Sequence, residues 1–167
     1  CSILEHKLNR YLGKDIKIWK IITSVEDFHS RFKALSRTYN YVLSFEKKTF
    51  LEGNYYHCPW SLDISRLNEG AKILLEYEDF TSFAKLHSDN TSNIFKLYYS
   101  EWQQKNDFLI YEIKADRFLR NMVRAITGTL LDLGRGKISI EKFREIIEAR
   151  NNQEASKSAP AHGLYLY

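Results

Sequence analysis

The apolar residues between Phe118 and Leu133 recur at helical spacing, and this stretch constrains the fold more than any other part of the chain. They form one stripe, made of Leu119, Met122, Val123, Ile126, Leu130 and Leu133. The segment Arg37–Phe45 alternates instead, with Tyr39, Tyr41, Leu43 and Phe45 on one face of an expected strand and Thr38, Asn40, Val42 and Ser44 on the other. A chain that carries both periods is expected to pack helices on a sheet.

Period, capping and turn chemistry predict further elements along the chain. They are a strand at Asp15–Ile22, a helix capped by Asp63 that runs to about Tyr77, strands at Ile94–Trp102 and Phe108–Ala115 joined over Gln103–Asp107, a helix at Phe118–Leu133 ended by Gly134 and Gly136, a helix capped by Ser139 that runs to about Ala149, and a strand at Gly163–Tyr167. From Arg37 onward this order is that of a split βαβ unit. We therefore predict a ferredoxin-like α+β fold, with an antiparallel or mixed sheet and helices on one face.

The uncovered face of such a sheet is free to bind a ligand. A sheet face that carries Tyr and Phe is a common platform for RNA bases. Aromatic residues make up 14% of this chain, and for each of them packing in the core is the alternative.

The composition fits one folded domain, because 44% of the 167 residues are apolar and 28% are charged. No apolar run approaches the length of about 18 residues that a membrane span requires. The cysteines Cys1 and Cys58 form no CxxC pair, which predicts a reduced chain in the cytoplasm. The net charge of +4 is compatible with a polyanionic partner but does not require one.

Metal sites and the common nucleophile motifs find no match in the sequence. The five histidines show no HxxxH or HExxH spacing, and there is no GxSxG elbow. Gly134-Arg135-Gly136 is not a phosphate-binding loop, because no Lys-Ser/Thr pair follows it. We therefore expect no catalytic zinc, no hydrolase triad and no nucleoside-triphosphate site.

Basic residues form two groups. Arg117, Arg120 and Arg124 follow helical spacing opposite the apolar stripe, where a solvated face is the ordinary interpretation. Gly128 continues their line and permits a ligand or another backbone to approach closely. The second group interleaves cations with aromatics, as suits RNA phosphates and bases, and consists of Arg31, Lys33 and Arg37 among Phe28, Phe32, Tyr39 and Tyr41.

Four blocks of the sequence resemble one family, in the same order. The first is Phe28-His29-Ser30-Arg31-Phe32 followed by Ser36-Arg37-Thr38-Tyr39-Asn40-Tyr41, and the second is Asp79-Phe80-Thr81-Ser82-Phe83. The third is Phe118-Leu119-Arg120-Asn121-Met122-Val123-Arg124 with Gly128, and the fourth is Ser158-Ala159-Pro160-Ala161-His162-Gly163-Leu164-Tyr165-Leu166. Together they resemble the TruA-type tRNA pseudouridine synthases over nearly the whole chain.

The resemblance implies an enzyme that isomerises uridine to pseudouridine in the tRNA anticodon stem-loop without any cofactor. In this family the catalytic Asp lies in a Gly-Arg-Thr-Asp block upstream of these four blocks, and no Asp of this sequence has that context. We therefore expect a fragment that is inactive by itself. Its expected domains are residues 1–24, left from an N-terminal domain, and residues 25–167, a catalytic and RNA-binding domain.

The resemblance also implies roles for individual residues. Tyr39 is expected to stack on the target base, and Arg124 is expected to pair with the catalytic Asp. Arg31 and Arg37 are expected to contact phosphates, and Tyr41 and Arg120 are further expected substrate contacts. The alternatives without a functional role are a core position on a strand for Tyr39 and a surface ion pair for Arg124.

The resemblance implies two partners, which are tRNA and, in the complete enzyme, a second copy of the protein. The alternative for the whole chain is a non-catalytic RNA-binding module of RRM-like topology. Such a module carries a glycine-containing RNP1 string on a sheet strand, and the expected strands Ile94–Trp102 and Phe108–Ala115 contain no glycine.

Overall fold

The structure is a computed structural model that describes residues 2–85 and 92–167. Cys1 and His87, which entered the cysteine and histidine arguments, lie outside the described residues. The chain divides into two compact units, Cys1–Ala34 and Leu35–Tyr167, and each is described by itself.

The first unit contains one helix, α1 (Ser2–Tyr11), within its described residues. The predicted strand at Asp15–Ile22 is wrong, because this segment follows α1 without strand pairing. The side chain of Asn9 donates to the carbonyl oxygen of Ile18 (2.8 Å) and accepts from its N–H (2.7 Å). The backbone of Ile18 is thus satisfied by a side chain, and a strand without a neighbouring strand has no ladder to join.

The second unit is built on a five-stranded sheet, with strands β1 (Arg37–Ser44), β2 (Tyr56–His57), β3 (Leu97–Lys105), β4 (Phe108–Ala115) and β5 (Leu164–Leu166). β1 pairs antiparallel with β4, and β4 pairs antiparallel with β3. On its other edge β1 pairs antiparallel with β5 near Tyr39 and parallel with β2 near Leu43. The sheet is therefore mixed.

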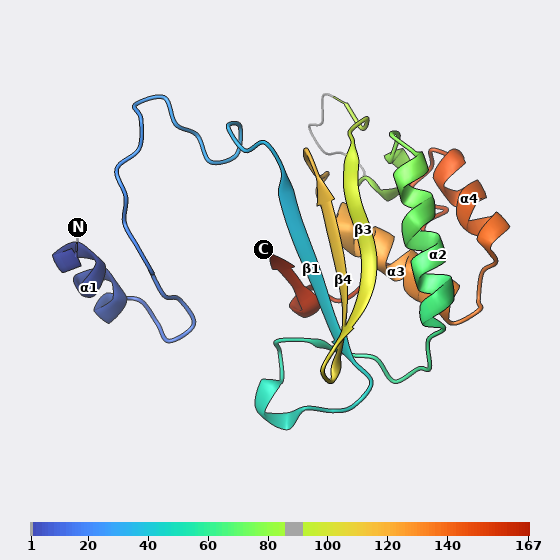
Figure 1. Cartoon of the computed structure of the whole chain (residues 1–167), viewed down its shortest axis with the longest axis horizontal. Coiled ribbons are helices and arrows are strands. Elements are labelled where there is room, and N and C mark those ends of the chain that lie inside the picture. The colour runs from blue at the N-terminus through green and yellow to red at the C-terminus, as the bar shows by residue number, and fades with distance from the viewer. Residues whose placement is uncertain (1, 86–91) are drawn as a thin grey trace. The chain divides into compact units, whose positions relative to one another are not determined.

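Helices cover one side of this sheet, namely α2 (Ile64–Ile73), α3 (Met122–Gly134) and α4 (Ile140–Glu148) (Figure 1). As predicted, the side chain of Asp63 caps α2 by accepting from the N–H of Arg66, and that of Ser139 caps α4 by accepting from the N–H of Lys142. The α+β class, the one-sided helical layer and, apart from the short strand β2, the order of strands and helices from Arg37 onward are thus confirmed.

The predicted boundaries differ from the structure at several ends. α3 begins at Met122, four residues later than predicted, because Asn121 adopts a left-handed conformation with φ of 67°. β3 begins at Leu97 and continues to Lys105, and the hairpin turns tightly at Asn106, whose φ is 53°. The short parallel strand β2 was not predicted.

The predicted apolar stripe is buried: Leu119, which precedes α3, and Met122, Val123, Ile126, Leu130 and Leu133 of α3 all lie in the core. Tyr41 and Leu43 of β1, with Tyr111 and Ile113 of β4, pack against this helical layer. The aromatic platform expected on the free face of β1 is therefore wrong. That face carries Thr38, Asn40 and Val42 on β1 and Ile110, Glu112 and Lys114 on β4.

None of the helices in the described part of the chain has the length and apolar character that crossing a bilayer requires.

Candidate active site

The first turn of α3 and the segment before β5 hold one another through a reciprocal pair of hydrogen bonds. Nε of Arg124 donates to the carbonyl oxygen of Ala159 (2.7 Å), and the N–H of Ala159 donates to the carbonyl oxygen of Arg124 (2.9 Å). Within the described residues Nε makes the only hydrogen bond of this guanidinium. Its two terminal NH₂ groups are thus left for an external anion, and the half-buried stem fixes their position.

Gly128 explains why this segment approaches the helix so closely. A Cβ atom at Gly128 would lie far inside van der Waals contact with the carbonyl oxygen of Lys157 and 3.1 Å from the backbone nitrogen of Ala159. The expectation that Gly128 admits another backbone is therefore confirmed. Two further hydrogen bonds join α3 and the residue before it to the same segment. The side-chain amide of Asn121 donates to the hydroxyl of Ser158 (2.7 Å), and the hydroxyl of Thr129 accepts from the N–H of Ser156 (3.2 Å).

Tyr41 anchors the same segment from the sheet. Its side chain is fully buried, and its hydroxyl donates to the carbonyl oxygen of Pro160 (2.9 Å). Burial raises the pKa of Tyr41 well above its ordinary value, Tyr56 raises it further, and the nearby charge of Arg124 opposes the shift. The expected substrate contact of Tyr41 is contradicted by this burial, and Tyr41 instead positions the backbone that holds Arg124.

Tyr39 lies two residues before Tyr41, on the same face of β1, but it is half-buried rather than enclosed. The rings of Tyr39 and Phe118 pack edge to face, with 5.2 Å between their centroids. The Tyr39 ring is thus held by an aromatic neighbour while part of its surface stays open.

The other expected site residues do not gather at this point. Arg117 and Arg120 precede α3, so the predicted helical stripe of Arg117, Arg120 and Arg124 is wrong, and Arg120 is exposed. Arg37 begins β1 in the second unit, whereas Arg31 belongs to the first unit, where its guanidinium lies 5.5 Å from the ring centroid of Phe32. The two units are described separately, so Arg31 is not placed relative to Arg124.

The block around Asp79 is structural in this fold. Asp79 accepts hydrogen bonds from the N–H and hydroxyl of Thr81, and its other oxygen pairs with Arg150 (3.1 Å). Phe80 and Phe83 are buried in the core. No group of three or more His, Cys, Asp or Glu side chains that could hold a metal ion occurs among the described residues.

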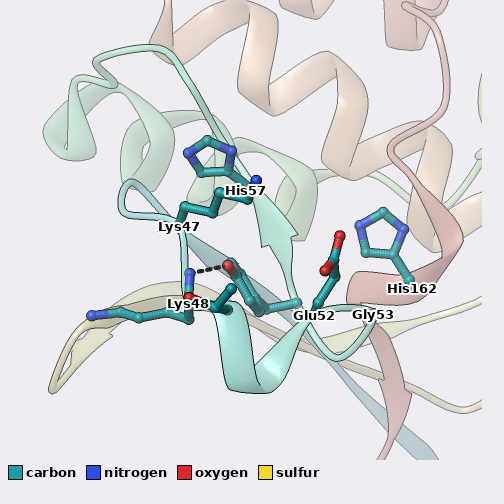
Figure 2. Close-up of a pocket in the computed structure, with 8 residues that line it drawn as sticks. Lys47, Lys48, Glu52, Gly53, His57 and His162 are labelled. Atoms are coloured by element: carbon teal, nitrogen blue, oxygen red, sulfur yellow. Dashed lines mark hydrogen bonds between the residues drawn. The ribbon is translucent and has the colours of Figure 1, made fainter.

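Two pockets, each of about 390 Å³, lie beside β2 and the segment that precedes β5, which we call the 158–163 segment after its residues. Figure 2 shows the first, where His57 of β2 and His162 face a loop that carries Lys47, Lys48 and Glu52. The second lies between Tyr56 of β2 and the C-terminal half of α3.

Comparison with known proteins identifies the family. A family model described as tRNA pseudouridine synthase matches residues 71–167, which include α3, Arg124 and the 158–163 segment. The chain belongs to the tRNA pseudouridine synthase family. The chain is also 47% identical to tRNA pseudouridine synthase A of Parabacteroides distasonis over 163 residues, covering 98% of this chain and 65% of that protein.

Other members of the tRNA pseudouridine synthase family match over the same extent. The chain is 46% identical to tRNA pseudouridine synthase A of Porphyromonas gingivalis, with 99% of this chain and 66% of that protein covered. The Bacillus subtilis protein of the same name is 36% identical, with 97% and 66% covered. The chain thus spans slightly less than two thirds of the length of these curated relatives.

Sequence reasoning missed two residues that shape this candidate site. Ala159 holds Arg124 through backbone atoms alone, and Phe118 holds Tyr39 from what was expected to be the first turn of a helix. The contact between Arg124 and Ala159 had one signal in the sequence, which was Gly128. A glycine in the interior of a helix indicates that another part of the chain approaches closely.

Proposed function

We propose that this chain is the part of a tRNA pseudouridine synthase that binds the RNA and supplies Arg124 and Tyr39 to the reaction. The enzyme would isomerise uridine in the tRNA anticodon stem-loop. RNA binding is assigned to residues 25–167, with residues 1–24 as a lead-in from another domain. The observation that carries the proposal is the Nε-anchored Arg124, which presents its terminal NH₂ groups from a segment that the family model matches.

In the proposed reaction no atom is gained or lost overall. The bond between N1 of uracil and C1′ of ribose breaks, and a bond between C5 and C1′ replaces it. The proton leaves C5, and N1 takes up a proton. Both bonds change within one nucleotide, so the balance requires no oxidant, reductant or cofactor.

Arg124 would hold the catalytic carboxylate ionised through a two-pronged hydrogen bond, because a neighbouring cation lowers the pKa of an acid. That carboxylate would come from outside these residues, since no Asp of the sequence lies in a Gly-Arg-Thr-Asp context. Tyr39 would stack against the extruded uracil and offset the cost of unstacking it. The complete enzyme would be a cytoplasmic homodimer.

The test is the salt dependence of tRNA binding by this chain. Each phosphate that Arg or Lys neutralises should add about −0.7 to −0.9 to the slope of log affinity against log salt. We expect a steep slope that becomes shallower by about one such unit in Arg37→Ala. An affinity for tRNA that does not change with salt would contradict the assignment.

The RRM-like alternative is not favoured by the free sheet face. On the free face of the sheet, the central strands β1 and β4 present Thr38, Asn40, Glu112 and Lys114 rather than aromatic rings on which bases could stack.

A further inference from the structure

We propose that the pocket between β2 and the C-terminal half of α3 binds a second nucleotide of the RNA, adjacent to the site of the target uridine. The proposal rests on the proposed function, because it names a further contact of the same substrate. The pocket has a volume of about 390 Å³ and lies wholly within the second unit. The residues that define its chemistry are Tyr56, Trp60, Asp132, Arg135, Lys137 and Lys157.

The pocket carries an excess of positive charge. Arg135 and Lys137 both lie 3.4 Å from the same oxygen of Asp132, so one carboxylate is shared between two cations. Lys157 takes part in no ion pair among the residues that the structure describes. Because three cations surround one anion, a phosphate group is the ligand that completes the charge balance.

The pocket also offers aromatic surface. The guanidinium of Arg135 lies 3.7 Å from the ring centroid of Trp60 and fixes the orientation of the indole through a cation–π contact. Trp60 is 40% exposed, so part of the ring remains available. Tyr56 forms a second aromatic wall. A ligand that brings both a phosphate and a flat base matches these walls, which is the chemistry of a nucleotide.

Position ties this pocket to the candidate active site. Ala159 and Pro160 line the pocket, and the same two residues hold Arg124 and Tyr41 through their carbonyl oxygens. Gly128, which also lines the pocket, is one helical turn beyond Arg124. A nucleotide next to a uridine at Arg124 would therefore lie close to this pocket.

The neighbouring pocket in Figure 2 is a weaker candidate for the same ligand. The ammonium group of Lys48 is already paired with Glu46 (3.0 Å) and Asp107 (2.9 Å), and Glu52 places a carboxylate on the wall. No cation–π pair among the described residues lies on its walls.

The experiment measures binding of fluorescently labelled tRNA by this chain and by two charge-reversed variants. Lys157→Glu should weaken the affinity on the order of tenfold and make the salt slope shallower. The matched control is Lys105→Glu, which makes the same charge change at an exposed position at the end of β3. It should change the affinity by less than about twofold.

A second pair of variants tests the aromatic wall without relying on charge. Trp60→Ala should weaken tRNA binding about tenfold, whereas Trp60→Phe, which keeps a ring, should restore most of the loss. Acetylation of lysines, read by mass spectrometry, should show that tRNA protects Lys137 and Lys157 but not Lys105.

The outcomes separate this inference from the proposed function. If the unaltered chain binds tRNA tightly while Lys157→Glu and Trp60→Ala bind equally well, the pocket proposal is overturned and the proposed function stands. If the unaltered chain shows no salt-dependent binding of tRNA, both are overturned.

Discussion

Arg124 and Ala159 are joined in both directions: the side chain of Arg124 donates to the Ala159 carbonyl (2.7 Å), and the Ala159 N–H donates to the Arg124 carbonyl (2.9 Å). The backbone bond fixes the separation between helix and segment, and the side-chain bond fixes the orientation of the guanidinium. A cation whose position is set before the ligand arrives loses little entropy on binding, and this anchoring supports the role that we propose for Arg124.

Replacement of Arg124 by lysine should abolish most of the activity of the complete enzyme. An ammonium group cannot both donate to Ala159 and present a two-pronged fork to a carboxylate. We expect a fall in kcat of about a hundredfold or more, measured as pseudouridine formed in tRNA. Arg144→Lys, which alters a surface pair with Glu76, is the matched control and should retain activity. Near-normal turnover in Arg124→Lys would refute the pairing role.

Gly128→Ala should destabilise the second unit by about 1–3 kcal/mol, because the added Cβ meets backbone atoms of Lys157 and Ala159 that cannot rotate away. Urea unfolding followed by circular dichroism measures the change. Gly13→Ala is the control, since a Cβ there meets nothing within 4 Å, and it should change stability by less than about 1 kcal/mol. Equal effects at the two positions would contradict the close approach.

Tyr41→Phe should cost about 1 kcal/mol of stability, because it removes the hydrogen bond to the carbonyl oxygen of Pro160. Its direct effect on tRNA affinity should be small, since Tyr41 is fully buried. Tyr98→Phe, at an exposed position, should leave stability unchanged. A large loss of tRNA affinity with unchanged stability would restore Tyr41 as a substrate contact.

The free energy of unfolding should decrease in acid, in part because Glu76 becomes protonated. Its hydrogen bond to Arg144 holds the pKa of Glu76 below the ordinary value of 4.5 in the folded chain. As the pH falls, the unfolded chain therefore takes up a proton on Glu76 before the folded chain does. The contribution of Glu76 to the free energy of unfolding is complete above pH 4.5, and it is lost as the pH falls through the pKa of Glu76 in the folded chain.

Arg144→Gln should make this acid-induced loss smaller, and thermal unfolding between about pH 6 and about pH 3 measures it. Lys105→Gln is the control, because Lys105 forms no ion pair within the described parts of the chain, 2–85 and 92–167. An identical acid sensitivity in Arg144→Gln and the unaltered chain would exclude the Glu76 contribution.

The fold could be predicted from sequence wherever periodicity and capping are local. The stripe from Leu119 to Leu133 and the caps Asp63 and Ser139 are properties of neighbouring residues, and all were confirmed. The segment Asp15–Ile22 has a strand-like composition, but strand formation depends on a partner elsewhere in the chain. Composition therefore could not decide that segment.

The candidate site could be predicted only in part, because alternation identifies two faces without saying which one the helices cover. Tyr39 and Tyr41 share a face, yet burial separates their roles. Arg120 lies outside α3 because Asn121 adopts a left-handed conformation. Asn adopts this conformation more often than most residues other than glycine, but that preference is weaker than the helical spacing of the apolar residues around it. Contacts such as Tyr41 with Pro160 join residues 119 positions apart and emerge only from tertiary structure.

The central claim is that this chain supplies Arg124 and Tyr39 to a reaction whose carboxylate comes from elsewhere. The most direct test is to incubate tRNA that lacks pseudouridine with this chain, and separately with this chain joined to the remaining third of the Parabacteroides distasonis protein. Mass spectrometry then locates pseudouridine in the RNA. We predict that the chain by itself binds the tRNA and forms none, whereas the joined protein forms it in the anticodon stem-loop. Pseudouridine formed by the chain by itself would contradict the account.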